Sequence, residues 1–304
     1  MQTSEENDFK LQHCADTLIS KLSESLNDKE SKLVGTALQA RMIAEIFQEN
    51  VAKYIFEQNA GFTIPQNFDI FTLYEKFIKR KIEIARTEKT CQSDLTEFDI
   101  IQAHEKYAFK TIFGENVANK QKCEDLHKFG IVSMNYNAFP HFTHRSFAEY
   151  FVASMLIQNI SSVYFIHIVS SEYEFDAIIN FIDSGIKHKL LEFLDDEELF
   201  KKIAAIIDGH LEISIESSIR EAKMKFRTVD LEQRKKFLHR LILKENVYLV
   251  KFLLKCLPHC RRETTENDFI SIFDDSGNNI FHLAATTQIK SLIEEIWNCV
   301  ERIY

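Results

Sequence analysis

Turn-forming residues are scarce in this sequence. It contains seven glycines and three prolines in 304 residues, which is about 3% of the chain against roughly 12% in average proteins. Sandwiches, propellers and turn-rich α/β folds need more of these residues to close their tight turns. The scarcity therefore predicts a chain dominated by α-helices.

The net charge of the chain indicates that nucleic acid is not its partner. The chain carries 37 basic and 46 acidic residues, a formal net charge of −9, and no sustained basic stripe, so nucleic acid is not an expected partner. The basic clusters Lys79–Lys81 and Arg234–Lys236 lie inside amphipathic segments and are predicted to be solvated helix faces. With 45% apolar and 27% charged residues, the composition is that of a soluble globular protein.

The cysteines and the N-terminal segment indicate an intracellular, reducing setting. Six cysteines are scattered along the chain, and its first residues are acidic and polar, unlike a secretory signal. We therefore expect a cytoplasmic protein with free thiols. The uncharged stretch Tyr150–Ser171 is long enough to cross a bilayer. Polar residues interrupt it and Asn159–Ser162 predicts a break, so we expect buried helices and no membrane contact.

The clearest strand signal lies near the middle of the chain. Gly130–Ser133 and Phe139–His144 flank the turn-prone Asn135–Asn137, a pattern that predicts a β-hairpin. Ser146 and Glu149 follow and have the spacing of a capping box, in which the serine caps a new helix. A hairpin set between helices and followed by a helix is typical of a winged-helix domain.

The C-terminal part contains two segments that resemble ankyrin repeats. Residues 274–285 combine a turn with a helix start of the T-P-L-H-x-A type, with Asn279–Phe281 in place of Thr-Pro-Leu. Residues 237–254 resemble the same repeat. His239 and His282 lie 43 residues apart, against roughly 33 in the standard repeat.

This spacing has two consequences. We expect an insertion near residues 261–268, and we expect each repeat histidine to hold a turn by hydrogen bonding rather than to bind a metal. About three repeats are usually needed for a stable stack. Two repeats therefore either pack on the preceding helices or once continued beyond Tyr304.

The predicted fold is all-α dominated: a helical bundle, a winged-helix domain with one small β-hairpin, and helical repeats of ankyrin type. The expected segments are a disordered tail (1–14), a helical domain (15–66), the winged-helix domain (67–160), a helical linker domain (161–228) and two ankyrin-like repeats (229–304).

Three runs in fixed order carry a family resemblance. They are Gly35–Phe47, then Leu73–Ile78 with His104–Ala108, then Phe142–Ala153. Together they resemble the C-terminal half of a NACHT-type signalling NTPase of the STAND class, particularly the arthropod-like NACHT–ankyrin proteins. The resemblance covers roughly residues 15–160, plus 229–304 for the repeats. The third run is the most specific, whereas ankyrin-like repeats are common.

The resemblance implies two candidate nucleotide contacts. In the family, a histidine of the third run contacts the β-phosphate of bound ADP and holds a closed, inactive state; His144 matches it. His144 also precedes a helix N-terminus, where N–H groups and the helix dipole favour an anion. Ala37 stands where the family usually has a proline that packs on the adenine. Both residues are candidates only when a P-loop domain is present.

The sequence contains no nucleotide-binding P-loop of the kind that such a switch uses. It contains no G-x-x-x-x-G-K-[ST] motif, so nothing cradles phosphates or supplies the lysine and the Mg²⁺-binding hydroxyl. We expect no enzymatic activity and no cofactor in this chain, with ADP or ATP bound only by a full-length protein. The resemblance leaves open whether Met1 is the true start or a P-loop domain precedes it.

Metal chemistry is not expected. Cys256 and Cys260 enclose His259, but they lie at a predicted helix end with no second ligand pair nearby. His141 and His144 are three residues apart, which on a strand points them to opposite faces.

The expected function is that of a non-catalytic regulatory and protein-interaction fragment of a NACHT–ankyrin intracellular switch, a class with many members in innate immune sensing. Protein partners would bind the repeats, and the chain would be capable of self-oligomerisation. The alternative is a stand-alone helical and ankyrin adaptor that binds proteins and no nucleotide. A DNA-binding winged helix is disfavoured because phosphate contacts dominate such affinity and the net charge is −9.

Overall fold

The computed structural model describes residues 4–25, 37–56, 68–87, 95–113, 126–135, 140–170, 175–194, 196–207, 238–256, 259 and 276–303. Helices dominate these residues, and they include one two-stranded antiparallel hairpin, as the scarcity of glycine and proline predicts. The chain divides into two compact units. The first unit comprises Met1–Ile100 and Lys120–Phe147; the second comprises Ile101–Asn119 and Ala148–Tyr304.

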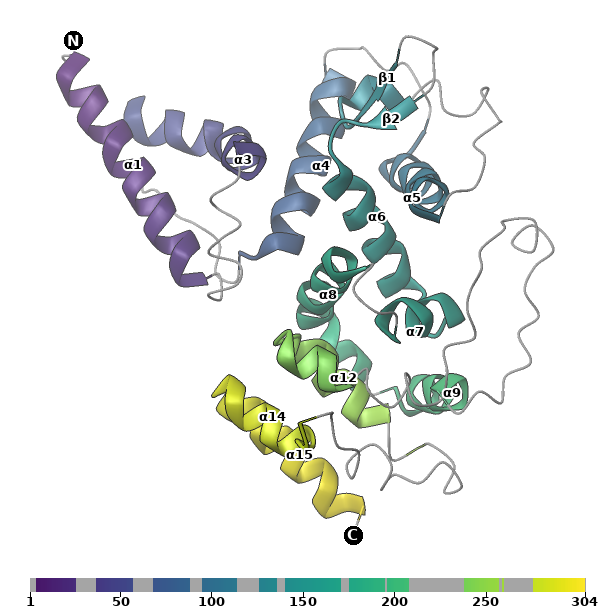
Figure 1. Cartoon of the computed structure of the whole chain (residues 1–304). Coiled ribbons are helices and arrows are strands. Elements are labelled where there is room, and N and C mark those ends of the chain that lie inside the picture. The colour runs from purple at the N-terminus through teal and green to yellow at the C-terminus, as the bar shows by residue number, and fades with distance from the viewer. Residues whose placement is uncertain are drawn as a thin grey trace. The chain divides into compact units, whose positions relative to one another are not determined.

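The first unit contains α1 (Ser4–Ser25), α3 (Ala37–Phe56), α4 (Ile70–Thr87), the 3₁₀ helix η2 (Leu126–Phe129), β1 (Val132–Met134) and β2 (Pro140–Phe142). Helices α5 (Glu97–Phe113) and α6 (Arg145–Gln158) contribute residues to both units. The second unit also contains α7 (Val163–Ser170), α8 (Asp176–Leu194), α9 (Glu197–Ile207), α12 (Val247–Cys256), α14 (Ile280–Thr287) and α15 (Lys290–Ile303) (Figure 1). Residues 238–243 are helical as well.

Helix α1 corrects the expected disordered tail over residues 1–14, because it begins at Ser4. Helix α1 packs against α3, and Cys14 on α1 is buried. Residues 4–14 therefore belong to a helix that packs on α3, which their polar composition did not indicate.

Helix α4 supplies much of the first unit's core. Its buried side chains recur at helical spacing and include Leu73, Phe77, Ile78 and Ile82. The cluster Lys79–Lys81, predicted to be a solvated helix face, is exposed at Lys79 and half-exposed at Arg80 and Lys81, and all three residues form ion pairs. Arg80 and Lys81 both reach acids on α3, so two of these pairs join α3 to α4. The other basic cluster, Arg234–Lys236, lies outside the described residues.

The predicted hairpin is present over shorter strands than the sequence suggests. Val132 pairs with Phe142, and both side chains are buried. Gly130 enters the hairpin with φ +70°, a conformation that glycine adopts without steric cost. Thr143 holds together the end of the hairpin that lies opposite its turn. Its N–H and its hydroxyl both donate to the carbonyl of Ile131, at 2.9 and 3.0 Å. The chain is thereby held where β2 turns into α6.

The second unit confirms the predicted break at residues 159–162, which separate α6 from α7. None of the helices in the described part of the chain has the length and apolarity needed to cross a membrane. The first C-terminal segment packs on the helices before it. Asp183 of α8 accepts a hydrogen bond from the N–H of Leu249 at the start of α12 (2.7 Å), and Lys244 pairs with Asp176 (2.7 Å).

Two helical pairs at the C-terminal end are in register. We name residues 238–243 with α12 the first helical pair, and α14 with α15 the second helical pair. Glu245 and Gln288 adopt positive φ of 54° and 56° at the turn inside each pair. Each lies six residues after His239 or His282, so the 43-residue offset applies to backbone geometry as well as to sequence. Helices α12 and α15 contact each other (Figure 1).

Candidate functional site

His144 stands at the corner where the hairpin meets α6. The helix begins at Arg145, one residue before Ser146, the residue expected to cap it. His144 performs this role: its Nδ1 accepts from the N–H of Ser146 (3.2 Å), and its carbonyl accepts from the N–H of Phe147 (3.1 Å). Cap positions usually belong to serine, threonine, asparagine or aspartate, which is why the sequence did not reveal a histidine cap.

A short hydrogen-bond chain fixes the tautomer of His144. The hydroxyl of buried Tyr74 donates to Oγ of Ser146 at 2.7 Å, and Oγ lies 2.6 Å from Nδ1 of His144. The serine proton is therefore directed to Nδ1, and Nδ1 serves as an acceptor. Assigned from this network, the neutral ring carries its proton on Nε2. His144 is exposed, so the one donor that it can offer a ligand is this Nε2–H.

The start of α6 is already occupied by the chain's own groups. A helix N-terminus attracts an anion through N–H groups that have no partner inside the helix. Here the N–H groups of Ser146 and Phe147 both donate to His144. Two of the N–H groups at this helix end therefore already have an acceptor within the chain.

The other residues singled out from sequence lie apart from this corner. Ala37 is the first residue of α3 and is exposed; no interaction between the described residues Ala37 and His144 is present. His141 lies on β2, where its Nε2 is 2.8 Å from Oγ of its cross-strand partner Ser133. The structure therefore joins His144 to Ser146 and Tyr74, not to the other nucleotide candidate.

His282 makes the kind of bond that its repeat-like position predicts. Oδ1 of Asn279 accepts from the N–H groups of Phe281 (3.1 Å) and His282 (3.2 Å), while Nδ1 of His282 lies 3.3 Å from the N–H of Asn279. This reciprocal capping box starts α14. Its counterpart His239 is buried within the first helical pair.

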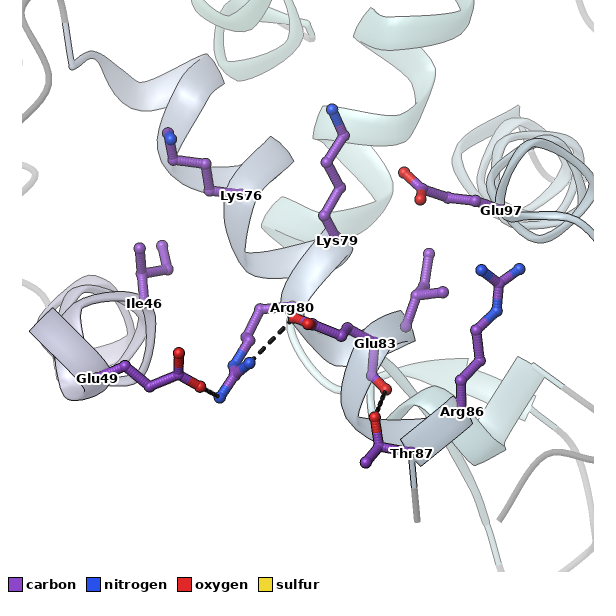
Figure 2. A pocket seen from close by; sticks show the side chains of 10 residues that line it. Ile46, Glu49, Lys76, Lys79, Arg80, Glu83, Arg86, Thr87 and Glu97 are labelled. Carbon is purple, nitrogen blue, oxygen red and sulfur yellow. Dashed lines mark hydrogen bonds and ion pairs between the residues drawn. The ribbon is translucent and has the colours of Figure 1, made fainter. Parts of the chain in front are cut away.

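A hollow of about 530 Å³ between α3, α4 and the start of α5 was not apparent from the sequence (Figure 2). Its basic residues are Lys76, Lys79, Arg80 and Arg86, and its acidic residues are Glu49, Glu83 and Glu97.

Arg80 lies between Glu49 and Glu83 in this hollow (Figure 2). It pairs with Glu83 at 3.0 Å and with Glu49 at 2.5 Å, and the bond to Glu83 contributes most to raising the pKa of its guanidinium. The hollow has the volume of a small-molecule site, but its charges largely neutralise one another.

A buried carboxylate was also missed. Glu105 on α5 is 4% exposed, and its Oε1 accepts hydrogen bonds from the hydroxyl of Ser154 (2.8 Å) and from Nε2 of Gln158 (2.9 Å) on α6. Burial raises the pKa of Glu105, although both hydrogen bonds and nearby Lys106 oppose that effect. Sequence periodicity could place Glu105 on a helix, but its partners lie 49 and 53 residues away.

Metal ligands are not assembled in the described part of the chain, where no group of three or more His, Cys, Asp or Glu side chains could hold an ion. Cys256 is buried and donates its S–H to the carbonyl of Phe252, one turn earlier in α12. His259 stacks on Phe200, with 6.0 Å between the ring centroids. Cys260 lies outside the described residues.

These features define a helix-dominated protein with one small hairpin, a histidine-capped helix after that hairpin, and two helical pairs in register. The chain matches no family model, no curated protein and no solved structure.

Proposed function

We propose that the chain is a non-catalytic regulatory and protein-interaction fragment of a NACHT–ankyrin type of intracellular switch. The observation that carries this proposal is the pair of in-register helical pairs, each with a left-handed residue six positions after its histidine. Stacked helical pairs in ankyrin-like arrays present extended surfaces to other proteins. The histidine-capped start of α6 follows the hairpin in the same order as in the family that the sequence resembles.

The array would bind protein partners through its first helices. Leu243 is the residue chosen to test this assignment, because its side chain is 56% exposed in the first helical pair. Residues around it belong to the same rigid surface, since Lys244 pairs with Asp176 and Arg240 donates to the carbonyl of Val169.

A mutation at Leu243 tests the assignment. Partners captured by the intact chain would be purified and titrated against wild type and Leu243→Asp, with binding measured by calorimetry. We expect at least a tenfold loss of affinity in Leu243→Asp. The matched control is Leu95→Asp, at a 42% exposed leucine of the first unit, which should bind as wild type. Equal binding by Leu243→Asp would contradict the proposal.

The nucleotide part of the proposal depends on a P-loop domain. The residues present do not form a nucleotide site by themselves, because the chain has no P-loop motif and the N–H groups of Ser146 and Phe147 are already bonded. In a full-length switch, His144 would offer Nε2–H to a phosphate oxygen. ADP is therefore expected to leave the melting temperature of this chain unchanged, whereas a ligand at a hundred times its Kd adds about 2.7 kcal/mol of stability. An ADP-dependent rise that His144→Ala removes would contradict this expectation.

The second candidate is a stand-alone adaptor without a nucleotide. The start of α6 favours it, because the N–H groups of Ser146 and Phe147 donate to His144 and not to a ligand. Sequencing the 5′ end of the native transcript separates the two candidates. An in-frame upstream P-loop supports the switch, whereas a transcript that begins at Met1 supports the adaptor.

A further inference from the structure

The hollow between α3, α4 and the start of α5 has two sides that differ in charge (Figure 2). On one side, Arg80 is paired with Glu83 at 3.0 Å and with Glu49 of α3. Two carboxylates therefore counter one guanidinium, and the charge of Arg80 is not available to a ligand. An anion would be attracted only by the other basic residues that line the hollow.

These other basic residues are Lys76, Lys79 and Arg86 of α4. Lys79 pairs with Glu75, which lies outside the lining, at 2.9 Å. Arg86 donates to the carbonyl of Leu95 at 3.0 Å, an acceptor without a formal charge. Lys76 is half-buried, and within the described residues it has no hydrogen bond or ion pair. Lys76 and Arg86 are thus two cations without a carboxylate partner in the described part of the chain.

Glu97 is the acid that borders these two cations. It lies in the first turn of α5, where the helix dipole favours its negative charge, and its carboxylate points into the hollow (Figure 2). One carboxylate therefore faces the two cations Lys76 and Arg86, so this side of the hollow keeps a net positive charge. A partly buried charge is stabilised by an opposite charge, which is what an anionic ligand would supply.

We propose that this side of the hollow binds a small dicarboxylate, a molecule with two carboxylates joined by a short carbon chain. Lys76 and Arg86 are ten residues apart on α4, which sets their Cα atoms about 15 Å apart along the helix. Two separated acidic groups match that spacing better than one compact anion does. A guanidinium binds a carboxylate through two parallel N–H bonds, and an ammonium acts as a point charge.

The rest of the lining suits the carbon chain of such a ligand. Ile46 of α3 and Ile82 of α4 contribute apolar atoms to a hollow of about 530 Å³, and small-molecule sites combine apolar walls with a few placed polar groups. The binding of a small molecule goes beyond the proposed binding of protein partners and does not depend on it.

A phosphate compound fits this hollow less well than a dicarboxylate. Phosphate sites commonly use unpaired N–H groups at a helix start. The helix start that borders the hollow is that of α5, where the N–H of Asp99 already donates to the hydroxyl of Thr96 and where Glu97 adds a second acid. The hollow therefore depends on side-chain cations alone, and inorganic pyrophosphate serves as the competing probe.

An NMR titration of the isotope-labelled chain tests the ligand class at low salt. The probes are dicarboxylates of increasing length from succinate through adipate to suberate, with hexanoate as the matched monocarboxylate. We expect millimolar dissociation constants that are smallest at an intermediate length, and binding of hexanoate at least about threefold weaker than that of adipate, because exposed ion pairs are individually weak. Equal binding along the series, hexanoate that binds as well as adipate, or pyrophosphate that binds more tightly than every dicarboxylate would overturn the proposal.

Charge variants test the site itself with the tightest dicarboxylate of the series. Lys76→Ala and Arg86→Ala should each weaken binding at least about threefold. Glu97→Gln should strengthen it, because this change removes the competing carboxylate, and a gain in affinity also shows that the variant is folded. The matched control is Lys110→Ala, an exposed lysine near the other end of α5, which loses the same charge and should bind as wild type. Weaker binding by Glu97→Gln, or an equal loss in Lys110→Ala and Lys76→Ala, would contradict the proposed site.

Discussion

At the scale of single residues, His144 is predicted to stabilise the start of α6. His144→Ala removes the acceptor for the N–H of Ser146, and loss of an N-cap costs about 1 kcal/mol. His144→Asn should restore most of that loss, since asparagine is a favoured cap. Urea unfolding of the three proteins measures the difference. The control His141→Ala, which loses only an exposed cross-strand bond to Ser133, should change stability by less than about 0.5 kcal/mol.

This cap changes how a mutation of His144 must be interpreted. A loss of stability in His144→Ala follows from the cap alone, so it carries no information about a nucleotide. If His144→Asn proved as unstable as His144→Ala, the cap would not be the reason for the loss. Only an ADP-dependent difference between these proteins bears on phosphate contact.

Glu105 predicts a particular dependence of stability on pH. Burial raises its pKa in the folded chain above the ordinary glutamate value of 4.5, so the folded state holds its proton to higher pH than the unfolded state does. This contribution to the free energy of unfolding is fully present below about pH 4.5 and is lost as the pH rises through the raised pKa. Glu105→Gln keeps an oxygen that can accept from Ser154 and Gln158 but has no proton to lose.

The stability of Glu105→Gln relative to wild type should therefore increase as the pH rises above 4.5. Urea unfolding at several pH values between 4 and 8 would measure this difference. The control Glu192→Gln, at an exposed position in the second unit, should show no such trend. A difference for Glu105→Gln that is constant or falls with pH would show that burial does not raise the pKa.

At the scale of secondary-structure elements, the turns inside the two helical pairs are predicted to be strained. Glu245 and Gln288 adopt positive φ, where a side chain costs about 1 kcal/mol and glycine costs little. Glu245→Gly and Gln288→Gly should each raise the free energy of unfolding by about 0.5–1 kcal/mol. Ala285→Gly, at an exposed position inside α14, should instead lower it by about 1 kcal/mol. Thermal unfolding of all three variants tests both signs, and destabilisation by all three would contradict the assigned turns.

Local patterns predicted the elements better than their ends and partners. The hairpin and the break at residues 159–162 follow from turn residues that lie within the segment itself. The start of α1 was missed because packing against α3, not local composition, orders it. Asp183 caps α12 from 66 residues away, and Arg80 reaches Glu49 from 31 residues away. Such contacts depend on tertiary structure, which periodicity does not encode.

At the scale of the whole molecule, composition was the most informative part of the sequence. The scarcity of glycine and proline predicted the helix-dominated class, because helices and short connections need few turn residues. The division of the chain into two compact units was not predictable in the same way. It passes through α5 after Ile100 and through α6 after Phe147, and no change of composition marks either position.

The net charge of the molecule leads to a prediction about nucleic acid. Proteins that bind duplex DNA without sequence preference neutralise several phosphates and reach Kd values of about 10⁻⁴–10⁻⁶ M at physiological salt. The chain has a net charge of −9, and Arg80 of its hollow is already paired with Glu49 and Glu83. We therefore expect no rise in the anisotropy of a labelled duplex at micromolar protein and physiological salt. Binding that weakens steeply as salt is added would contradict this expectation, because that dependence is the signature of displaced counterions.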